Sequence, residues 1–155
     1  MTIESIRRFA PTDLPAGDRR TVRVVGVLPT RPTTVAEAFR AAARLIAANG
    51  HWQGDYVPDA FDREMDVPHA LRPMSIVAAL KCAMSGDPHR DSLLADNAIA
   101  VLAARLEVGG EVGPYRTGIF DLEEHIAAWG DAPGRSVESV VAVLEAAADA
   151  TVVAL

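Results

Sequence analysis

A run of apolar residues spaced three and four positions apart most constrains the fold of this chain. It ends at Leu106 and comprises Leu93, Leu94, Ala98, Val101, Leu102 and Leu106. This spacing places apolar side chains on one face of an α-helix and does not match the alternation of a strand. Asp87 is expected to cap the helix and Pro88 to occupy its first position. Gly109 and Gly110 should stop it.

Four further segments have the same period. The first is expected to begin at Thr34, which forms a capping box with Glu37, and to end at Gly50. The second should run from Pro73 to Gly86 and the third from Asp121 to Gly130. Ser136 is expected to cap the fourth. The side chains expected to face inward include Phe39, Ile46, Val77, Leu80, Leu122, Ile126, Trp129, Val140 and Leu144. We therefore predict an all-α fold in which about five helices form a compact orthogonal bundle.

Residues 1–32 lack this period and are interrupted by prolines. Residues 21–28 form a β-branched run that is typical of a short β-strand. Such a strand needs a partner, which would be the β-branched tail at 151–153 or a second subunit. The alternative is an irregular arm that packs over the helices. We expect two regions, an N-terminal arm over residues 1–32 and a helical domain over residues 33–155.

Composition limits the class of protein. A chain of 155 residues is long enough for one domain that buries about two thirds of its unfolded surface. The net charge of −6 argues against a nucleic-acid partner, with the arginines at 19, 20 and 23 as the one local exception. A single cysteine, Cys82, excludes an intramolecular disulfide and a cysteine-based zinc site and suits a reducing compartment.

The sequence also lacks the common signals for membranes, export and cofactors. No run of about 18 apolar residues is present, and the first residues do not resemble a secretory signal, so we expect a cytoplasmic protein without a membrane partner. Glycine-rich phosphate loops, zinc-binding histidine motifs and paired cysteines are missing. We therefore expect no cofactor and no metal.

The candidate catalytic residues lie in or near the polar segment 51–72. A connection of this length without periodic structure is either functional or poorly ordered. His51 and His69 could act as acid or base if burial and a carboxylate such as Asp55 moved their pKa toward neutral pH. Asp131 is the other acid–base candidate. The alternative for His51 is a contact with the last carbonyls of the preceding helix. The aspartates of the segment, Asp62 among them, lack the spacing of a calcium loop and are expected to be solvated.

Three aromatic residues are the candidate ligand-binding residues. Trp52, Tyr56 and Trp129 could line an apolar pocket for a flat ligand, and the alternative is that the two tryptophans are core anchors. Cys82 is expected to be a buried thiol and His89 to be exposed at a helix start.

The sequences 43–46 (ARLI), 52–56 (WQGDY), 74–80 (MSIVAAL) and 126–136 (IAAWGDAPGRS) resemble a family of small helical proteins of unknown function from GC-rich soil bacteria and their phages. The resemblance covers about residues 35–148. Family members usually carry Trp-Cys where this chain has Met74-Ser75, and Asn where it has Gly130. The resemblance implies no activity.

Two functional hypotheses follow. The first is a small acidic binding or interaction module that forms a homo-oligomer or binds a protein partner through the arm and an exposed alanine–valine face, or that binds a small molecule. The alternative is a cofactor-independent enzyme, of cyclase or isomerase type, in a specialised biosynthetic pathway. A pocket that contains a histidine and a carboxylate would favour the enzyme, and a flat apolar patch over a solid core would favour the module.

Overall fold

The computed structural model of the protein describes residues 30–114 and 116–153. The helices and the site belong to one compact unit that begins at Arg31. The predicted strand at 21–28 and the arginines at 19, 20 and 23 lie outside the described residues.

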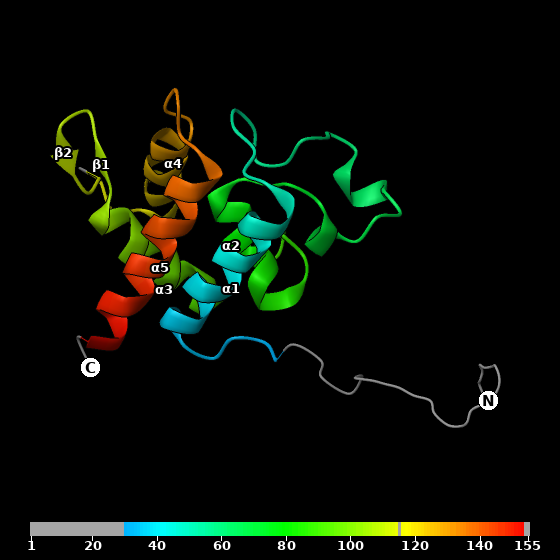
Figure 1. The fold of residues 1–155 in the computed structure, drawn as a ribbon, viewed down its shortest axis with the longest axis horizontal. Coiled ribbons are helices and arrows are strands. Elements are labelled where there is room, and N and C mark those ends of the chain that lie inside the picture. Colours follow the sequence, from blue (N-terminus) through cyan, green and yellow to red (C-terminus); the bar gives the residue numbers. More distant parts are fainter. Residues whose placement is uncertain (1–29, 115, 154–155) are drawn as a thin grey trace, which may run out of the picture. The chain divides into compact units, whose positions relative to one another are not determined.

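The described part of the chain contains five α-helices, which confirms the all-α class (Figure 1). They are α1 (Val35–Asn49), α2 (Ile76–Ser85), α3 (Leu93–Arg105), α4 (Ile119–Gly130) and α5 (Val137–Val153). Two short 3-10 turns, η2 (Asp62–Glu64) and η3 (His69–Leu71), lie in the polar segment between α1 and α2. Strands β1 (Glu107–Val108) and β2 (Glu111–Val112) form a small antiparallel hairpin, in which Glu107 is opposite Val112.

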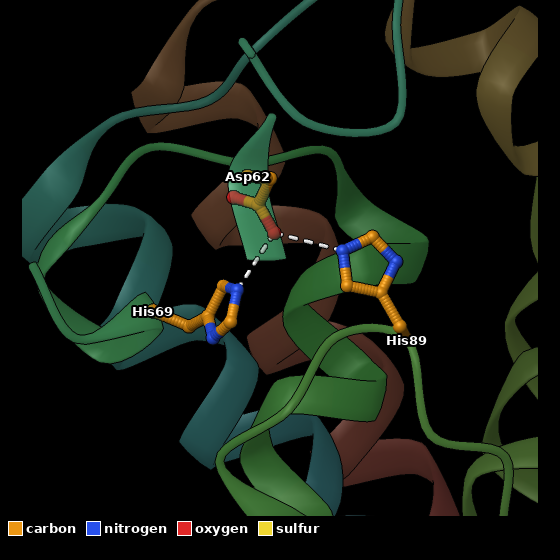
Figure 2. Close-up of side chains that lie close together, drawn as sticks. All are labelled: Asp62, His69 and His89. Carbon is orange, nitrogen blue, oxygen red and sulfur yellow. Dashed lines mark hydrogen bonds and ion pairs between the residues drawn. The ribbon is translucent and has the colours of Figure 1, made fainter. Parts of the chain in front are cut away.

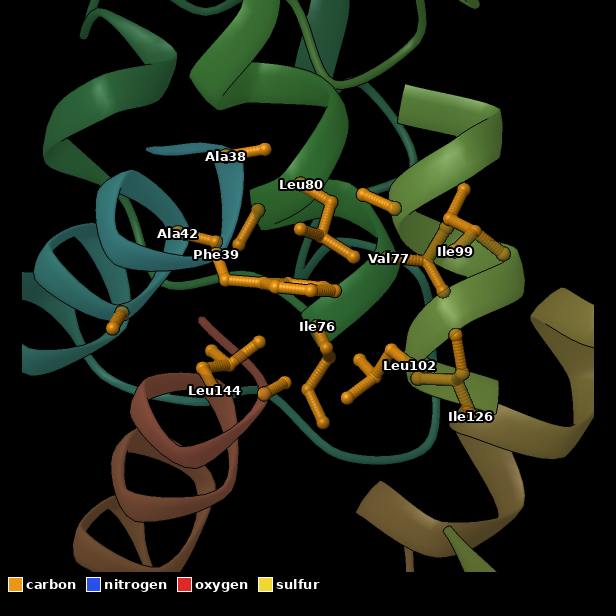
Figure 3. Close-up of a cluster of buried hydrophobic side chains, with 14 of the residues drawn as sticks. Ala38, Phe39, Ala42, Ile76, Val77, Leu80, Ile99, Leu102, Ile126 and Leu144 are labelled. Atoms are coloured by element: carbon orange, nitrogen blue, oxygen red, sulfur yellow. The ribbon is translucent and has the colours of Figure 1, made fainter. Parts of the chain in front are cut away.

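The core lies between α1, α2, α3, α4 and α5. Helix α1 packs mainly along α5 and then against α2, while α3 packs against α4. The labelled apolar side chains come from all five helices, and the ring of Phe39 from α1 lies in their midst (Figure 3). Alanines at 38, 42, 78, 79, 98 and 147 are fully buried. Because these side chains are small, the helices can approach closely around a few large ones.

The predicted start of α1 is confirmed with one change in its cap. The Thr34 hydroxyl accepts a hydrogen bond from the Glu37 amide at 3.1 Å. The Glu37 carboxylate, however, accepts from the amide of Thr33 at 2.8 Å, one residue earlier than a capping box requires. At the far end, Gly50 has a φ of +104°, a conformation that glycine adopts without strain.

The predicted start of α3 is wrong. The Asp87 carboxylate accepts a hydrogen bond from the His89 amide at 2.9 Å, which closes a turn rather than capping a helix. The hydroxyl of Ser92 caps α3 instead, because it accepts from the Ala95 amide at 3.1 Å. Residues 87–91 are therefore a connection, and Pro88 is buried in it.

The inward face of α3 is also only partly as predicted. Leu93 is 77% exposed and Val101 37% exposed, whereas Ile99 and Ala95 are buried. Apolar residues occur around most of this helix, so their spacing did not define one face. Leu102 and Leu106 are buried, as predicted.

Two other predicted helix starts differ by a few residues. Helix α2 is capped by Ser75 rather than opened by Pro73, and α4 begins after Gly118 rather than Asp121. Residues 151–153, considered as a strand partner, form the last turn of α5, where the Thr151 hydroxyl donates to the Ala147 carbonyl at 2.7 Å. Among the described residues, no helix is long and apolar enough to cross a membrane.

The central position of Phe39 can be tested by truncation. We expect Phe39→Ala to lower the free energy of unfolding by about 3–5 kcal/mol, because it leaves a cavity in a core built mostly from small residues. Leu93→Ala, at an exposed site, should change it by less than about 0.5 kcal/mol. Urea unfolding monitored by circular dichroism measures both, and equal effects would contradict the assignment of the core.

Candidate functional site

The first residues of the polar segment are held against the start of α2. His51 and Met74 form a parallel bridge, in which the Trp52 amide donates to the Met74 carbonyl at 3.0 Å. The Ser75 amide then donates to the carbonyl of Tyr56 at 3.1 Å. Residues 51–56 are therefore fixed beside the N-terminus of α2.

The same residues are also tied to the end of α4. The Gln53 side-chain amide donates to the Gly130 carbonyl at 2.8 Å. The Gly54 amide donates to the Asp131 carboxylate at 2.9 Å. These bonds satisfy a carbonyl at the C-terminus of α4 and bring residues distant in sequence into one site.

A cavity of about 360 Å³ lies between this segment, α2 and α4. Ile76, Val77 and Ile126 provide apolar walls. Four acidic residues also line the cavity, namely Asp55, Glu123, Glu124 and Asp131. Of the residues that the structure describes, no lysine or arginine lines it. We call it the acidic cavity.

Among the residues that the structure describes, His51 is the one imidazole that lines the acidic cavity. Burial lowers the pKa of His51, and the charge of Arg135 lowers it further, against the opposing effect of Asp131. The imidazole is therefore neutral at pH 7 and can accept a proton or a hydrogen bond. Gly130 makes room for this ring, since a Cβ there would lie 3.1 Å from the His51 Nε2 atom.

Tyr56 and Asp55 separate the acidic cavity from a second cavity of about 380 Å³, since both residues line both spaces. The Tyr56 hydroxyl donates a hydrogen bond to the Pro88 carbonyl. Burial, with the negative charge of Glu123 next in effect, raises the pKa of Tyr56 far above its usual value. Tyr56 therefore remains protonated and acts as a fixed wall.

Beside the second cavity, two histidines converge on one buried carboxylate (Figure 2). The Asp62 Oδ2 atom lies 2.6 Å from Nε2 of His69 and 2.8 Å from Nε2 of His89. An ionised carboxylate can only accept, so each Nε2 carries a proton and donates it. We call these three residues the Asp–His cluster.

Arg72 completes the environment of Asp62. Its guanidinium Nη1 donates to the other carboxylate oxygen, Oδ1, at 2.6 Å and to the Asp62 backbone carbonyl at 3.0 Å. Burial by itself raises the pKa of Asp62, but the hydrogen bonds from His89 and His69 and the charge of Arg72 outweigh it, so the pKa lies below its usual value. The carboxylate therefore stays ionised although only 5% of its side chain is exposed.

The structure brings together four of the seven residues that the sequence suggested for a site. His51, Asp55, Tyr56 and Asp131 line the acidic cavity. His69 does not line the acidic cavity and is hydrogen-bonded to Asp62 instead.

The two tryptophans do not line either cavity. Trp129 is buried in the core, and the Arg135 guanidinium stacks 3.7 Å from the centre of its ring. Trp52 is 38% exposed. The predicted pocket formed by both tryptophans and Tyr56 is therefore not seen, because the Trp129 indole packs inward and leaves Tyr56 as the one aromatic of the three at the cavity.

Sequence reasoning missed Asp62, Arg72 and His89. His89 was expected to be exposed, yet only 19% of its side chain is accessible, because the turn at residues 87–91 directs it toward Asp62. Asp62 was expected to be solvated and is buried. Asp62 and His89 lie 27 positions apart, a spacing that matches no ligand motif. The one available signal was a histidine shortly after the polar segment 51–72.

The fold and the site together define a small all-α protein whose α1–α2 connection borders two cavities. The chain matches the Family of unknown function (DUF6197) over residues 30–150 and belongs to it. This match confirms the resemblance to a family of unknown function. No curated protein and no solved structure matches the chain.

The ion pair of Asp62 should make stability depend on pH. Because the pKa of Asp62 is lower in the folded protein, its stabilising effect is complete above the unfolded pKa of about 3.9 and is lost as the pH falls through the folded pKa. We expect Asp62→Asn to reduce the free energy of unfolding at pH 7 by about 3 kcal/mol, since Arg72 loses its charged partner.

Urea unfolding between about pH 3 and pH 7 measures this effect. The matched control is Asp66→Asn, which removes an exposed carboxylate from the same segment and should change stability by less than about 0.5 kcal/mol. An Asp62→Asn protein as stable as this control would show that the buried pair does not hold the segment.

Proposed function

We propose that the protein binds a small organic cation, an amine with an apolar group, in the acidic cavity. The observation that supports this proposal is the composition of the lining, in which apolar walls and four carboxylates occur together with no lysine or arginine among the described residues. A volume of about 360 Å³ lies within the range of small-molecule sites.

The carboxylates differ in how available their charges are. Glu123 is paired with Lys81 at 3.1 Å, so its charge is already compensated. Asp55, Glu124 and Asp131 are exposed residues that line the cavity. An ammonium group would gain charge-assisted hydrogen bonds from these oxygens while its apolar part covers Ile76 and Ile126.

Catalysis is the second candidate function. His51, Asp55 and Asp131 line the same apolar cavity, and the neutral imidazole of His51 suits a general base. A cofactor-independent cyclase or isomerase of a biosynthetic pathway would use this base while the carboxylates stabilise a cationic intermediate. Loss of turnover in His51→Gln, with ligand affinity retained, would support it.

A matched ligand pair tests the binding proposal. We expect 2-phenylethylamine to bind the full-length chain in isothermal titration calorimetry and phenylacetate, similar in shape and opposite in charge, not to bind. Glu124→Gln and Asp131→Asn should each weaken amine binding about three- to tenfold, because each removes one carboxylate charge. Glu145→Gln, an exposed residue of α5 outside the lining, is the control.

The pH dependence adds a second readout. As the pH falls through the lowered pKa of His51, below 6.5, the imidazolium should repel the amine and binding should weaken. Equal binding of amine and carboxylate, or unchanged affinity in both carboxylate variants, would exclude the proposal.

We also propose that the protein acts in the cytoplasm and that self-association or a protein partner accompanies ligand binding. The association with a second copy or a partner is supported by two exposed apolar side chains: Phe120, which lines the acidic cavity, is 82% exposed and Leu93 is 77% exposed. We expect light scattering over a dilution series to show a concentration-dependent mass that Phe120→Ser reduces. A constant monomer mass, together with no captured partner, would count against this role.

A further inference from the structure

We propose that Asp62, His69 and His89 bind a divalent transition-metal ion of the zinc class. This inference is independent of the proposed amine binding in the acidic cavity, because none of the three residues lines that cavity. Asp62 and His89 line the second cavity instead.

The geometry of the donor atoms is the first argument. The three ligand atoms, two Nε2 and one Oδ2, all lie within 4.8 Å of one another. They come from three separate places, η2, η3 and the turn after α2, and point to one location (Figure 2). Around a tetrahedral ion with bonds of about 2.1 Å, ligand atoms lie about 3.4 Å apart. The two oxygen–nitrogen distances, now 2.6 Å and 2.8 Å, would therefore widen by less than about 1 Å, and the two ring nitrogens already lie within 4.8 Å of each other.

The type of donor defines the class of metal. Two imidazole nitrogens and one carboxylate oxygen suit Zn²⁺, Co²⁺, Ni²⁺ or Fe²⁺, whereas Ca²⁺ and Mg²⁺ prefer sites built from oxygen. Binding requires each imidazole to move its proton from Nε2 to Nδ1, a change of tautomer that leaves the ring neutral.

The surroundings leave room for an exchangeable ligand. Three protein ligands leave coordination positions open, as in catalytic rather than structural zinc sites. Asp62 and His89 face the second cavity of about 380 Å³, which can supply water or a small anion to those positions.

The charges nearby have opposing effects. Arg72 repels a cation, but its bond to Oδ1 also fixes the Asp62 carboxylate with Oδ2 toward the histidines. The second cavity is lined by three more acids, Asp55, Asp59 and Glu64, and by one base, Arg63. The excess of negative charge on the cavity side favours a cation there.

The same contacts would also serve a hydrogen-bonded anchor that binds no metal. His69→Gln and His89→Gln distinguish the two, because glutamine keeps an N–H donor for Asp62 and removes the imidazole ligand. His125→Gln is the matched control, since His125 contacts the Leu106 carbonyl and not Asp62.

Calorimetric titration of the full-length chain with Zn²⁺ should show one saturable site. His69→Gln and His89→Gln should each bind Zn²⁺ more than about tenfold more weakly than the wild type, and His125→Gln should bind Zn²⁺ like the wild type. Co²⁺ should produce a visible absorption band that Zn²⁺ removes and excess Mg²⁺ does not.

A measurement on the wild type avoids any effect of the variants on folding. Zn²⁺ should shift the ring-nitrogen NMR signals of His69 and His89 and leave that of His125 in place. Absence of saturable binding, signals of His69 and His89 that do not move, or equal affinity in all three variants would each overturn the proposal and identify the cluster as an anchor only.

Discussion

The position of the polar segment between α1 and α2 depends on the hydrogen bonds and the ion pair that the Asp62 carboxylate forms. A charge removed from water is costly unless hydrogen bonds and opposite charge replace its hydration. Here His69 and His89 bind one oxygen and Arg72 binds the other, and only 5% of the Asp62 side chain is exposed. These bonds fix η2 to η3 and to the turn after α2, so a connection of more than twenty residues keeps a defined position.

Tyr56 links this anchor to the rest of the site. Its hydroxyl is bound to the Pro88 carbonyl, in the same turn that carries His89, and its ring centre lies 5.8 Å from that of His89. On its other side, Tyr56 lines the acidic cavity with His51 and Asp131. Tyr56 is therefore one protonated side chain that lies beside His89 and also lines the acidic cavity.

Local sequence signals predicted the helices better than their ends. Thr34 and Ser136 were found as caps because a hydroxyl before a periodic segment is a strong signal. Asp87 was expected to cap α3 because Asp-Pro often begins a helix, and only the hydrogen bond that the His89 amide donates to the Asp87 carboxylate shows that Asp87 closes a turn. The inward face of α3 was misassigned at Leu93 and Val101, since a helix that is apolar on most sides has no single preferred face.

By itself, the sequence determined the all-α class and the five helices of the described residues, because apolar periodicity and helix caps are local properties. It also singled out the segment 51–72 through its length and polarity. Tertiary structure alone decided that His51, Tyr56 and Asp131 share a cavity and that His69 belongs with Asp62 and His89. Those groupings depend on contacts across up to about eighty positions, and such contacts are fixed by how helices pack, which no short spacing in the chain records.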